Sequence, residues 1–466
     1  MTAALATLCT AHPGLSGVQL LDDGPAALAV RIALVRRARI SIDAQYYIWQ
    51  PDVSGRLLLE ELAAAAARGV RVRLLLDDFG SPRIPPLLPD LPGLELRMFN
   101  PVRLRWPRWL NWLFDFPRLN RRMHNKSLTV DGIAAIIGGR NIGDEYFDAT
   151  HPGLAADLDV IAIGAIAAET TANFGHYWHS PAAVPHAAVP GAVLPPGEDS
   201  PVRQTCLAAA ASPATAAMID ASDDFIWAGV RILSDPPGKI SGDAAEMALL
   251  LPQLLAALGP VTRHFLLVSA YFIPTPAVAA LLGTLARQGV QVDVLTNSLL
   301  SNNVSLVHAW YAPWRRRLLA VGVRLWEMRG AAGARARLGL VPRNLLVRLR
   351  RPPGTHSFFR SSASALHAKT LVADGRWLFV GSMNVDERSL HLNTEMGFLI
   401  DSPALASRLE AGLTAGLPRF AWAVEALPGG LAWRDGDRLL QPEPGTTAPL
   451  RLAIRLLGLL PLGHLF

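Results

Sequence analysis

The chain begins with helix and strand patterns in alternation. Apolar positions recur at helical spacing from Ala26 to Arg37, and the run from Ile40 to Trp49 has the apolar, aromatic character of a buried strand. A second helix is predicted over Gly55 to Arg68, with Gly69 ending it, and the apolar run from Val70 to Leu76 predicts the next strand. Strand, helix and strand at this spacing indicate a parallel crossover in a sheet covered by helices on both faces.

The same order of patterns returns in the second half of the chain. A strand is predicted from Phe265 to Phe272, a helix from Pro276 to Gln288 and another strand from Val290 to Thr296. By pattern, Tyr47 aligns with Tyr271, which lies 224 positions later (271 − 47). Each half is therefore predicted to be an α/β unit, and the chain a tandem repeat of that unit.

Composition divides the chain into four predicted segments. Residues 1–180 form a first domain, and residues 181–204, rich in proline and alanine, form a linker. Residues 205–425 form a second domain. Residues 426–466 form a tail, which carries a hairpin signal at Arg434 to Gly436 and then an apolar run interrupted by arginine.

Two nearly identical motifs lie one in each domain. The first contains His124, Lys126, Asp131 and Asn141, and the second contains His367, Lys369, Asp374 and Asn384, each 243 positions later (367 − 124). In each motif an aspartate and a glycine follow a short apolar run and precede another, which predicts a tight hairpin turn. Asp131 and Asp374 fall at these turns, so we expect them to have structural roles.

The spacing within each motif predicts phosphodiester chemistry. Side chains two apart in an extended strand share a face, so each motif presents an imidazole beside an ammonium group. Two such motifs around one point give one histidine to attack phosphorus and one to protonate the leaving alkoxide. The lysines would hold the non-bridging oxygens as negative charge develops, so no metal or other cofactor is expected.

The use of lysine supports this interpretation. The chain has 44 lysines and arginines in total, but only three are lysines, namely Lys126, Lys239 and Lys369. Two of the three lie in the paired motifs, where a compact ammonium is not replaced by a planar guanidinium. Lys239 follows a Pro-Pro-Gly turn, and we weigh a contact with phosphate or headgroup equally against an exposed loop lysine.

The paired motifs, each followed by Gly-Gly or Gly-Ser and then asparagine, resemble those of the phospholipase D superfamily. Three stretches are similar to bacterial cardiolipin synthases of the C type. They are the residues just before His124, the stretch from Gly138 to Phe147, and Thr296 to Leu299 with His308 downstream. The resemblance covers most of the chain from about Gly17 onwards. It implies two α/β/α sandwich domains related by a pseudo-twofold axis, with one active site at their interface.

The resemblance also implies roles for residues. His124 would be the nucleophile that forms a phosphohistidine, and His367 the acid that then deprotonates the acceptor alcohol. Asn141, Asn384 and Ser382 would donate hydrogen bonds to phosphate oxygens. The implied product is cardiolipin, made by phosphatidyl transfer between phospholipids with phosphatidylglycerol as acceptor.

A catalytic imidazole needs one ring nitrogen held by a partner, which is commonly a carboxylate. Aligning the strand patterns after each motif sets Asp159 against Glu395. We therefore expect Asp159 to orient His124 and Glu395 to orient His367, although sequence order leaves the reverse assignment open. The remaining candidates for contacts with substrate are Tyr47, Tyr271, Lys239 and His308.

Charge and composition favour a membrane surface. The net charge of +6 suits anionic partners, either lipid or nucleic acid. Arg103 to Phe114 mixes arginine with tryptophan, and Pro449 to Pro461 is apolar but too short to span, so both suit a bilayer interface, although packing within the protein is the alternative for each. Cys9 and Cys206 have no metal or disulfide spacing, and no uninterrupted apolar run reaches about 18 residues.

Together with the resemblance, these features imply a peripheral enzyme on the cytoplasmic face of the bacterial inner membrane. Its partners would be phospholipid substrates and an anionic membrane surface, with no nucleic acid expected and any auxiliary protein unknown. Hydrolysis by water, on a lipid or a nucleic acid, is the first alternative because the same intermediate serves it. A membrane-binding scaffold with an inert site is the second, and the intact paired motifs argue against it.

Overall fold

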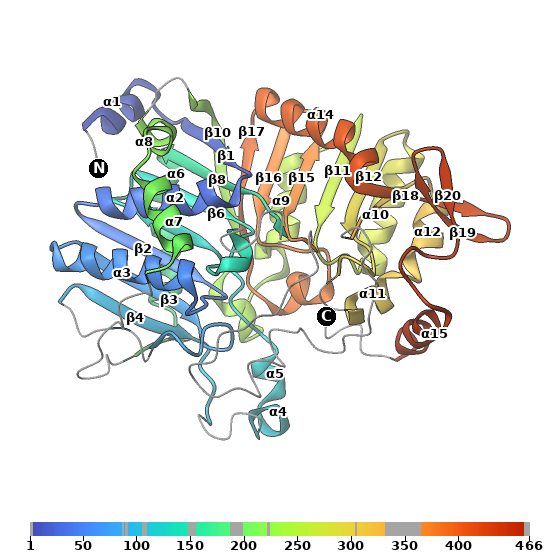
Figure 1. Ribbon diagram of the computed structural model, residues 1–466, viewed down its shortest axis with the longest axis horizontal. Coiled ribbons are helices and arrows are strands. Elements are labelled where there is room, and N and C mark those ends of the chain that lie inside the picture. Colours follow the sequence, from blue (N-terminus) through green and yellow to red (C-terminus); the bar gives the residue numbers. More distant parts are fainter. Residues whose placement is uncertain are drawn as a thin grey trace.

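The computed structural model describes residues 3–85, 88, 92–104, 110–147, 155–186, 199–220, 224–302, 305–330 and 365–460 of the 466. Its strands form two α/β halves side by side, the first in blue to green and the second in yellow to red (Figure 1).

The strands of the first half are β1 Ser16–Leu21, β2 Ser41–Tyr46, β3 Arg71–Asp77, β4 Leu94–Phe99, β5 Ser127–Val130, β6 Ala134–Gly138, β7 Ala155–Ala156, β8 Asp159–Gly164 and β9 Ala183–Pro185. Its helices are α1 Ala3–Ala11, α2 Gly24–Arg37, α3 Val53–Ala67, α4 Asn111–Phe114, α5 Phe116–Leu119, α6 Ala165–Trp178, α7 Pro201–Ala210 and α8 Pro213–Asp220. The predicted helices and strands before residue 80 are confirmed to within a few residues.

The strands of the second half are β10 Ile226–Ser234, β11 His264–Ser269, β12 Gln291–Asn297, β13 Arg324–Met328, β14 Ala365–Leu366, β15 Lys369–Ala373, β16 Trp377–Gly381, β17 Met396–Asp401, β18 Ala421–Leu427, β19 Gly430–Asp435 and β20 Arg438–Leu440. Its helices are α9 Leu250–Leu258, α10 Pro276–Arg287, α11 Ser305–Tyr311, α12 Trp314–Ala320, α14 Pro403–Phe420 and α15 Ala448–Leu457.

The pairings order the strands symmetrically about the β1–β10 contact. The first half runs β9-β4-β3-β2-β5-β6-β8-β1, and the second continues as β10-β17-β16-β15-β11-β12-β13-β18. Each strand of the first half thus has a counterpart in the second, including β5 with β15, β8 with β17 and β3 with β12. The paired motifs lie on the counterpart hairpins β5–β6 and β15–β16, so the predicted tandem α/β/α architecture with pseudo-twofold symmetry is confirmed.

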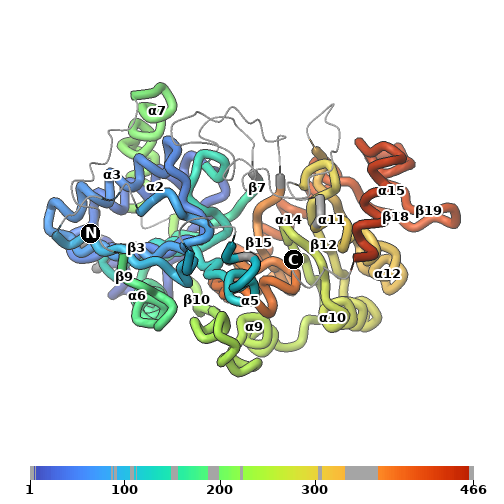
Figure 2. Tube along the Cα trace, turned by 90° about the horizontal axis from the view of Figure 1, so that it is seen from below, coloured from blue at the N-terminus to red at the C-terminus, as the bar shows by residue number. Residues whose placement is uncertain are grey.

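Each sheet has an apolar core on both of its faces, because alternate residues of a strand point to opposite sides. On β8, Ile161 and Ile163 pack into the core beneath α2 and α3, while Val160 and Ala162 pack on the side of α6. The tube view shows α3 and α6 on opposite sides of β3 (Figure 2). The core on the α6 side continues across the seam to Leu405 of α14, so the two halves are fused through a shared apolar layer.

The structure corrects the predicted domain boundary. Strand β9 lies in the predicted linker but pairs with β4 as the last strand of the first sheet. Helix α7 begins at the end of the predicted linker and runs into the predicted second domain, and α8 lies in that domain, but the two bury Ala210 and Ile219 in the first core. The proline and alanine content of this stretch did not indicate that its strand and helices pack on the first domain. Residues 187–198, the middle of the predicted linker, lie outside the described residues.

The predicted tail is in part an extension of the second sheet. Strand β18 pairs with β13, and β19 and β20 form the predicted hairpin, with Gly436 at a φ of 58° in its turn. Helix α15 follows and packs against α11. Within the part of the chain that the structure describes, no helix combines the length and apolarity needed to cross a bilayer.

Candidate active site

His124 precedes β5 and is oriented by the second half of the chain. Its backbone N–H donates to the carbonyl of Thr394 at 2.9 Å, and its Nδ1 lies 2.8 Å from Oε2 of Glu395. The side chain of His124 is 12% exposed and that of Glu395 is fully buried. With Nδ1 held by the carboxylate, Nε2 is the nitrogen left for chemistry.

His367 precedes β15 and is oriented by the first half in the same way. Its backbone N–H donates to the carbonyl of Ala156 at 2.9 Å, and its Nδ1 lies 2.6 Å from Oδ2 of Asp157. The side chain of His367 is 20% exposed, and Asp157 is buried beneath it. Each histidine therefore takes its backbone acceptor and its carboxylate from the opposite half, and neither half holds a complete site.

The environment keeps both imidazoles neutral near pH 7. Burial, and then the nearby Lys126 and Lys369, hold the pKa of His124 well below its usual value. Burial and Lys369 also lower the pKa of His367, to about 4, although Asp157 opposes the shift. A neutral imidazole with Nδ1–H on a carboxylate has a lone pair on Nε2, as nucleophilic attack or general base catalysis requires.

The two lysines form a buried pair of ammonium groups. Nζ of Lys126 donates to the backbone carbonyl of His124 at 2.5 Å, and Nζ of Lys369 donates to that of His367. Burial lowers the pKa of Lys126 to about 7 and that of Lys369 to about 8, with each lysine's neighbouring carboxylates opposing the shift. A bound phosphate anion would favour the charged form of both.

Asn141 and Asn384 are buried and anchored through their carbonyl oxygens. Oδ1 of Asn141 accepts from the backbone N–H of Ile48 at 3.1 Å, and Oδ1 of Asn384 accepts from that of Tyr271 at 3.4 Å. This leaves the amide nitrogen of each side chain to donate to another group. The arrangement suits donation to phosphate oxygens.

The predicted assignment of carboxylates to histidines is wrong in two respects. Glu395 orients His124 and not His367, and the partner of His367 is Asp157 and not Asp159. Asp159 instead forms buried ion pairs with Arg31 at 2.8 Å and Arg140 at 3.3 Å.

Strand register explains the error. Gly138 pairs with Asp159 in the first half, and its counterpart Gly381 pairs with Gly397 in the second, so Asp157 is the counterpart of Glu395. The alignment by pattern was therefore two residues out of register. A two-residue shift keeps every side chain on its own face, so apolar alternation does not detect it.

The first motif has Gly139 at the position where the second motif has Ser382. The two carboxylates explain this difference. A Cβ atom on Gly139 would lie 2.1 Å from Oδ1 of Asp157, so the shorter carboxylate occupies that space. In the second half, Oγ of Ser382 donates to Oε2 of Glu395 at 2.5 Å. Ser382 therefore contacts the carboxylate behind His124, whereas a contact with phosphate was predicted.

The pKa values of the two carboxylates are shifted in opposite directions. Burial raises the pKa of Glu395 to about 7, with Lys126 as the largest opposing influence. Burial also acts to raise the pKa of Asp157, but His367, Lys369 and Arg140 outweigh it and bring the pKa below its usual value. The carboxylates that orient the two histidines therefore differ in pKa.

Lys239 does not reach the site as predicted. It is buried, and its Nζ donates to Oδ2 of Asp235 and to the carbonyl of Ser389, both at 2.8 Å. The same Oδ2 of Asp235 accepts from the backbone N–H of Glu395 at 2.9 Å. Lys239 thus neutralises a carboxylate that holds the backbone of Glu395, which the sequence of a Pro-Pro-Gly turn did not indicate.

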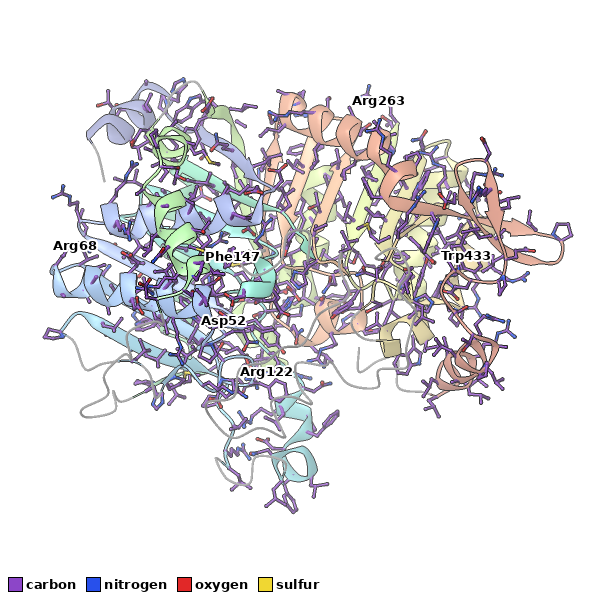
Figure 3. The ribbon with its side chains drawn as sticks, in the orientation of Figure 1. Asp52, Arg68, Arg122, Phe147, Arg263 and Trp433 are labelled. Atoms are coloured by element: carbon purple, nitrogen blue, oxygen red, sulfur yellow. The ribbon has the colours of Figure 1, made fainter. Side chains whose placement is uncertain are left out.

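His308 belongs to a different cluster, which corrects its predicted contact with substrate. Its Nε2 lies 2.9 Å from Oε1 of Glu443, and Arg315 contacts both. Arg315 also pairs with Glu327, to which Trp433 donates. Figure 3 shows Trp433 far to the right of Arg122, which lies near the centre, two residues before His124. This cluster ties the tail to the second half.

Tyr47 lies against His124, with the ring centroids 5.1 Å apart in a T-shaped arrangement. Its predicted counterpart, Tyr271, contacts the apolar cluster of Ile273, Val307 and Trp310 instead. The register of β2 and β11 matches Gln45 with Val268, so the counterpart of Tyr47 is Ala270. The aromatic ring on His367 is supplied by Tyr146, at 5.2 Å, which sequence analysis did not identify.

Asp131 and Asp374 hold the hairpin turns. Asp131 has a φ of 54° and accepts from the backbone N–H groups of Arg39, Ile40 and Ser41. Asp374 has a φ of 55° and accepts from those of Thr262, Arg263 and His264. Both bind the start of a neighbouring strand, as expected of structural residues.

Comparisons with known proteins show which family the chain resembles. A family model described as "Cardiolipin synthase, PLD-like domain" matches residues 32–178 and 254–415. Cardiolipin synthase C of Escherichia coli (strain K12) is 39% identical over 482 residues, covering 99% of this chain and 98% of that protein. Cardiolipin synthase A of Klebsiella pneumoniae subsp. pneumoniae is 25% identical, covering 88% of this chain and 72% of that protein.

Among solved structures, the phosphatidylserine synthase of Haemophilus influenzae Rd KW20 superposes with a TM-score of 0.58 at 14% identity. The superposition covers 90% of this chain and 92% of that one. At this identity the likeness shows that the two proteins share a fold.

Proposed function

The chain belongs to the family of cardiolipin synthases with PLD-like domains, and we propose that it transfers a phosphatidyl group between two phospholipids through a phosphohistidine on His124. The chain is a phosphatidyltransferase by this membership. The observation that carries the mechanism is the crossed pairing of His124 with Glu395 and of His367 with Asp157. It supplies two oriented imidazoles from two halves to one phosphorus.

In the first step, Nε2 of His124 attacks the phosphorus of the donor lipid, and the bond from phosphorus to the headgroup oxygen breaks. His367 gives its proton to that oxygen, so the headgroup leaves as a neutral alcohol. The bound phosphodiester is an anion and offsets Lys369 and Lys126, both of which hold down the pKa of His367. Substrate binding therefore makes the imidazolium form of His367 accessible.

In the second step, the now neutral His367 takes the proton from the hydroxyl of the acceptor lipid. The acceptor oxygen bonds to phosphorus, and the bond from phosphorus to Nε2 of His124 breaks, with its electron pair returning to nitrogen. Both histidines regain their starting states. With phosphatidylglycerol as acceptor, the product is cardiolipin.

Lys126 and Lys369 bind the non-bridging oxygens of the phosphodiester in both steps. Each ammonium group lies beside its own histidine, held on a backbone carbonyl. The amide nitrogens of Asn141 and Asn384 add neutral donors from the segments just after β6 and β16. Such donors stabilise negative charge most effectively in a site that excludes water.

We infer that α15 binds the surface of an anionic bilayer. One stripe of the helix, Leu450 and Ile454, is buried against Leu299 and Ala309. The opposite side is apolar but exposed, with Leu452 at 58% and Leu456 at 56% on the helix and Leu459 at 79% just after its end. Arg455, beside these leucines on the helix, is also exposed. A helix with a second apolar stripe flanked by arginine suits the boundary between headgroups and acyl chains.

A second contact with the bilayer is supported by α4. Leu113 and Phe114 at its end are 66% and 78% exposed, and the side chain of Arg103 nearby is 72% exposed. Residues 105–109, which include two of the predicted interfacial tryptophans, lie outside the described residues. Figure 1 shows α4 and α15 along the lower side of the molecule. As part of this proposal, the protein takes a peripheral position on the cytoplasmic face of the inner membrane.

Product analysis tests the proposed function. The purified protein is incubated with labelled phosphatidylglycerol in mixed micelles, with and without phosphatidylethanolamine, and the lipids are separated. The proposal predicts labelled cardiolipin and release of the donor headgroup. Conversion to phosphatidic acid alone would mean that water is the acceptor. Cleavage of DNA with no lipid conversion would contradict the assignment to lipid.

A further inference from the structure

The residue before each histidine is held by a polar side chain from the end of another strand of the same half. We propose that Asp77 and Asn297 are the positioning residues of the two catalytic histidines, acting through Met123 and Leu366. The inference rests on the proposed function to the extent that His124 and His367 are the reacting pair. Neither residue contacts the reacting atoms in this assignment.

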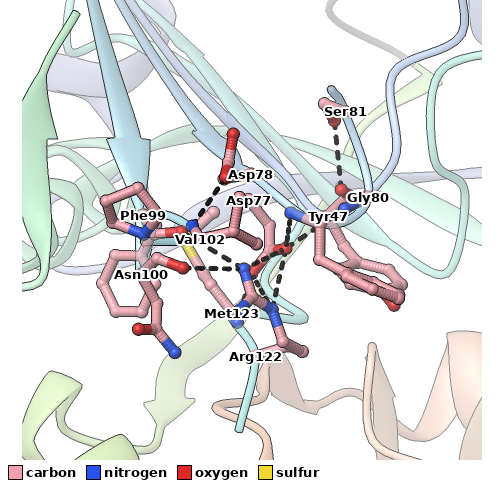
Figure 4. Close-up of polar contacts among 12 residues, drawn as sticks. Tyr47, Asp77, Asp78, Gly80, Ser81, Phe99, Asn100, Val102, Arg122 and Met123 are labelled. Atoms are coloured by element: carbon pink, nitrogen blue, oxygen red, sulfur yellow. Dashed lines mark hydrogen bonds and ion pairs between the residues drawn. The ribbon is translucent and has the colours of Figure 1, made fainter. Parts of the chain in front are cut away.

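Asp77 is the last residue of β3 and is fully buried. Its Oδ2 accepts from the backbone N–H of Met123 at 3.0 Å, and Oδ1 accepts from Nη2 of Arg122 at 2.8 Å. Figure 4 shows the Asp77 carboxylate between these two consecutive residues. Arg122 also donates to the carbonyl of Asn100 at 3.0 Å, so this anchor joins two strand ends. The chain that enters His124 is thereby fixed.

Asn297 is the last residue of β12 and is buried. Its Oδ1 accepts from the backbone N–H of Leu366 at 2.9 Å, and its Nδ2 donates to the carbonyl of the same residue at 2.8 Å. Oδ1 also accepts from Oγ of Ser301, and Nδ2 also donates to the carbonyl of Ala270. Both ends of the amide therefore bond Leu366, and the contacts with Ser301 and Ala270 hold the amide itself in place.

The two anchors are counterparts under the pseudo-twofold symmetry. Strands β3 and β12 correspond in sheet order, and Asp77 and Asn297 are their last residues. Met123 and Leu366 are 243 positions apart (366 − 123), the same offset as the histidines. The backbone residue before the histidine is therefore held in both halves, by a carboxylate in the first and by an amide in the second.

The anchors complete the restraint on each histidine. The opposite half fixes the backbone N–H and Nδ1 of His124, through Thr394 and Glu395. Its own half fixes the residue before it, through Asp77, and its backbone carbonyl, through Lys126. Loss of the anchor would let the imidazole shift relative to phosphorus while the carboxylate still holds Nδ1. A displacement of about 1 Å costs roughly 10²-fold in rate, since attack depends on alignment.

The test compares anchor variants with a matched control in the full-length enzyme. Asp77→Ala and Asn297→Ala each remove one anchor, and Asp77→Asn keeps an acceptor for Met123. Asp43→Ala is the control, because Asp43 is equally buried and pairs with Arg73 at 2.7 Å and 2.9 Å, and contacts neither histidine. It reproduces the cost of breaking a buried ion pair without touching the anchor.

Lipid transfer gives the first readout. We expect Asp77→Ala and Asn297→Ala to lower kcat by about 10²-fold with KM changed by less than about threefold, since binding groups stay in place. Asp77→Asn should recover kcat to within about tenfold of the wild type. If both alanine variants keep kcat within about twofold of Asp43→Ala, the proposal is overturned. Asn297→Ala and Asp77→Asn decide the matter if Asp77→Ala does not fold.

Amide hydrogen exchange gives a second readout that needs no substrate. The amide of Met123 should exchange at least about tenfold faster in Asp77→Ala, and that of Leu366 in Asn297→Ala, with neither affected in Asp43→Ala. Unchanged exchange would contradict the anchors themselves. An enzyme that converts no lipid but shows the predicted exchange would contradict the proposed function and leave the anchors in place.

Discussion

His124 Nδ1 lies 2.8 Å from Oε2 of Glu395, a carboxylate 271 residues later in the chain. Its counterpart is the 2.6 Å contact of His367 with Asp157, in the opposite direction. The halves are therefore interlocked at the site itself, since each contributes one histidine and the carboxylate that orients the other. This crossed arrangement explains why a duplicated half-site functions as one centre.

Removing a crossed carboxylate should lower catalysis strongly. Glu395→Gln and Asp157→Asn are expected to reduce kcat by about 10²- to 10⁴-fold, because the imidazole loses its tautomer and orientation. Steady-state transfer assays would measure this. Asp159→Asn is the informative comparison, since Asp159 pairs with Arg31 and should affect stability more than kcat. If Asp157→Asn kept the full kcat while a stably folded Asp159→Asn lost it, the carboxylate that orients a histidine would be Asp159, as the sequence predicted.

Activity should decline as the pH rises above neutrality. The pKa of Lys126 in the free enzyme is lowered to about 7 by burial, so the ammonium form that binds phosphate is lost above that pH. We expect kcat/KM to fall above about pH 7 and to approach a tenfold loss per pH unit. A profile of kcat/KM from pH 5 to pH 10 measures it. A constant kcat/KM up to pH 9 would show that Lys126 is charged throughout.

Lys126→Met should abolish transfer but stabilise the fold. The folded-state pKa of about 7 lies below the usual 10.5, so the unfolded chain binds more protons between these values. Wild-type stability therefore rises with pH across this window, and the advantage of methionine is largest below pH 7. Thermal unfolding at pH 6 and pH 10 would reveal a higher Tm for the variant, mainly at pH 6.

Lys239→Met is the contrasting case for stability. Lys239 forms a buried ion pair with Asp235 at 2.8 Å, and its loss leaves that carboxylate unpaired. Breaking such a pair costs about 3–5 kcal/mol, so this variant should have a clearly lower Tm. If Lys239→Met and Lys126→Met changed Tm in the same direction at pH 6, the distinction between the two buried lysines would be wrong.

Binding to vesicles should depend on the exposed stripe of α15. Changing Leu452, Leu456 and Leu459 together to serine should strongly reduce co-sedimentation with vesicles rich in phosphatidylglycerol, because about 2 kcal/mol of burial per leucine is lost. Tm should stay near the wild-type value, since the packed stripe of Leu450 and Ile454 is retained. Undiminished binding by the triple variant would contradict the docking role of α15.

The sequence was sufficient for features that depend on short-range pattern. The paired motifs, the turns at Asp131 and Asp374, and the strand–helix–strand order follow from local spacing, and the structure contains them. Alignment failed where register matters, because a two-residue shift replaced Asp157 with Asp159 without changing which face is apolar.

Burial and crossing contacts were beyond the reach of the sequence. Lys239 and His308 are polar residues with no local sign that each lies in a buried ion-pair cluster. Asp77 and Asn297 had a visible signal, as polar residues directly after an apolar strand, but their partners are 46 and 69 positions later. Only the fold brings such distant positions together.

The most direct test of the central claim is to trap the intermediate. In His367→Ala, a phosphatidyl donor with a p-nitrophenol headgroup needs no proton to leave, and no base remains to activate an acceptor. The account predicts release of nitrophenol and a stable phosphatidyl adduct on the peptide that contains His124, detected by mass spectrometry. No adduct should form in His124→Ala. An adduct on His367 in His124→Ala, with none on His124 in His367→Ala, would contradict the account.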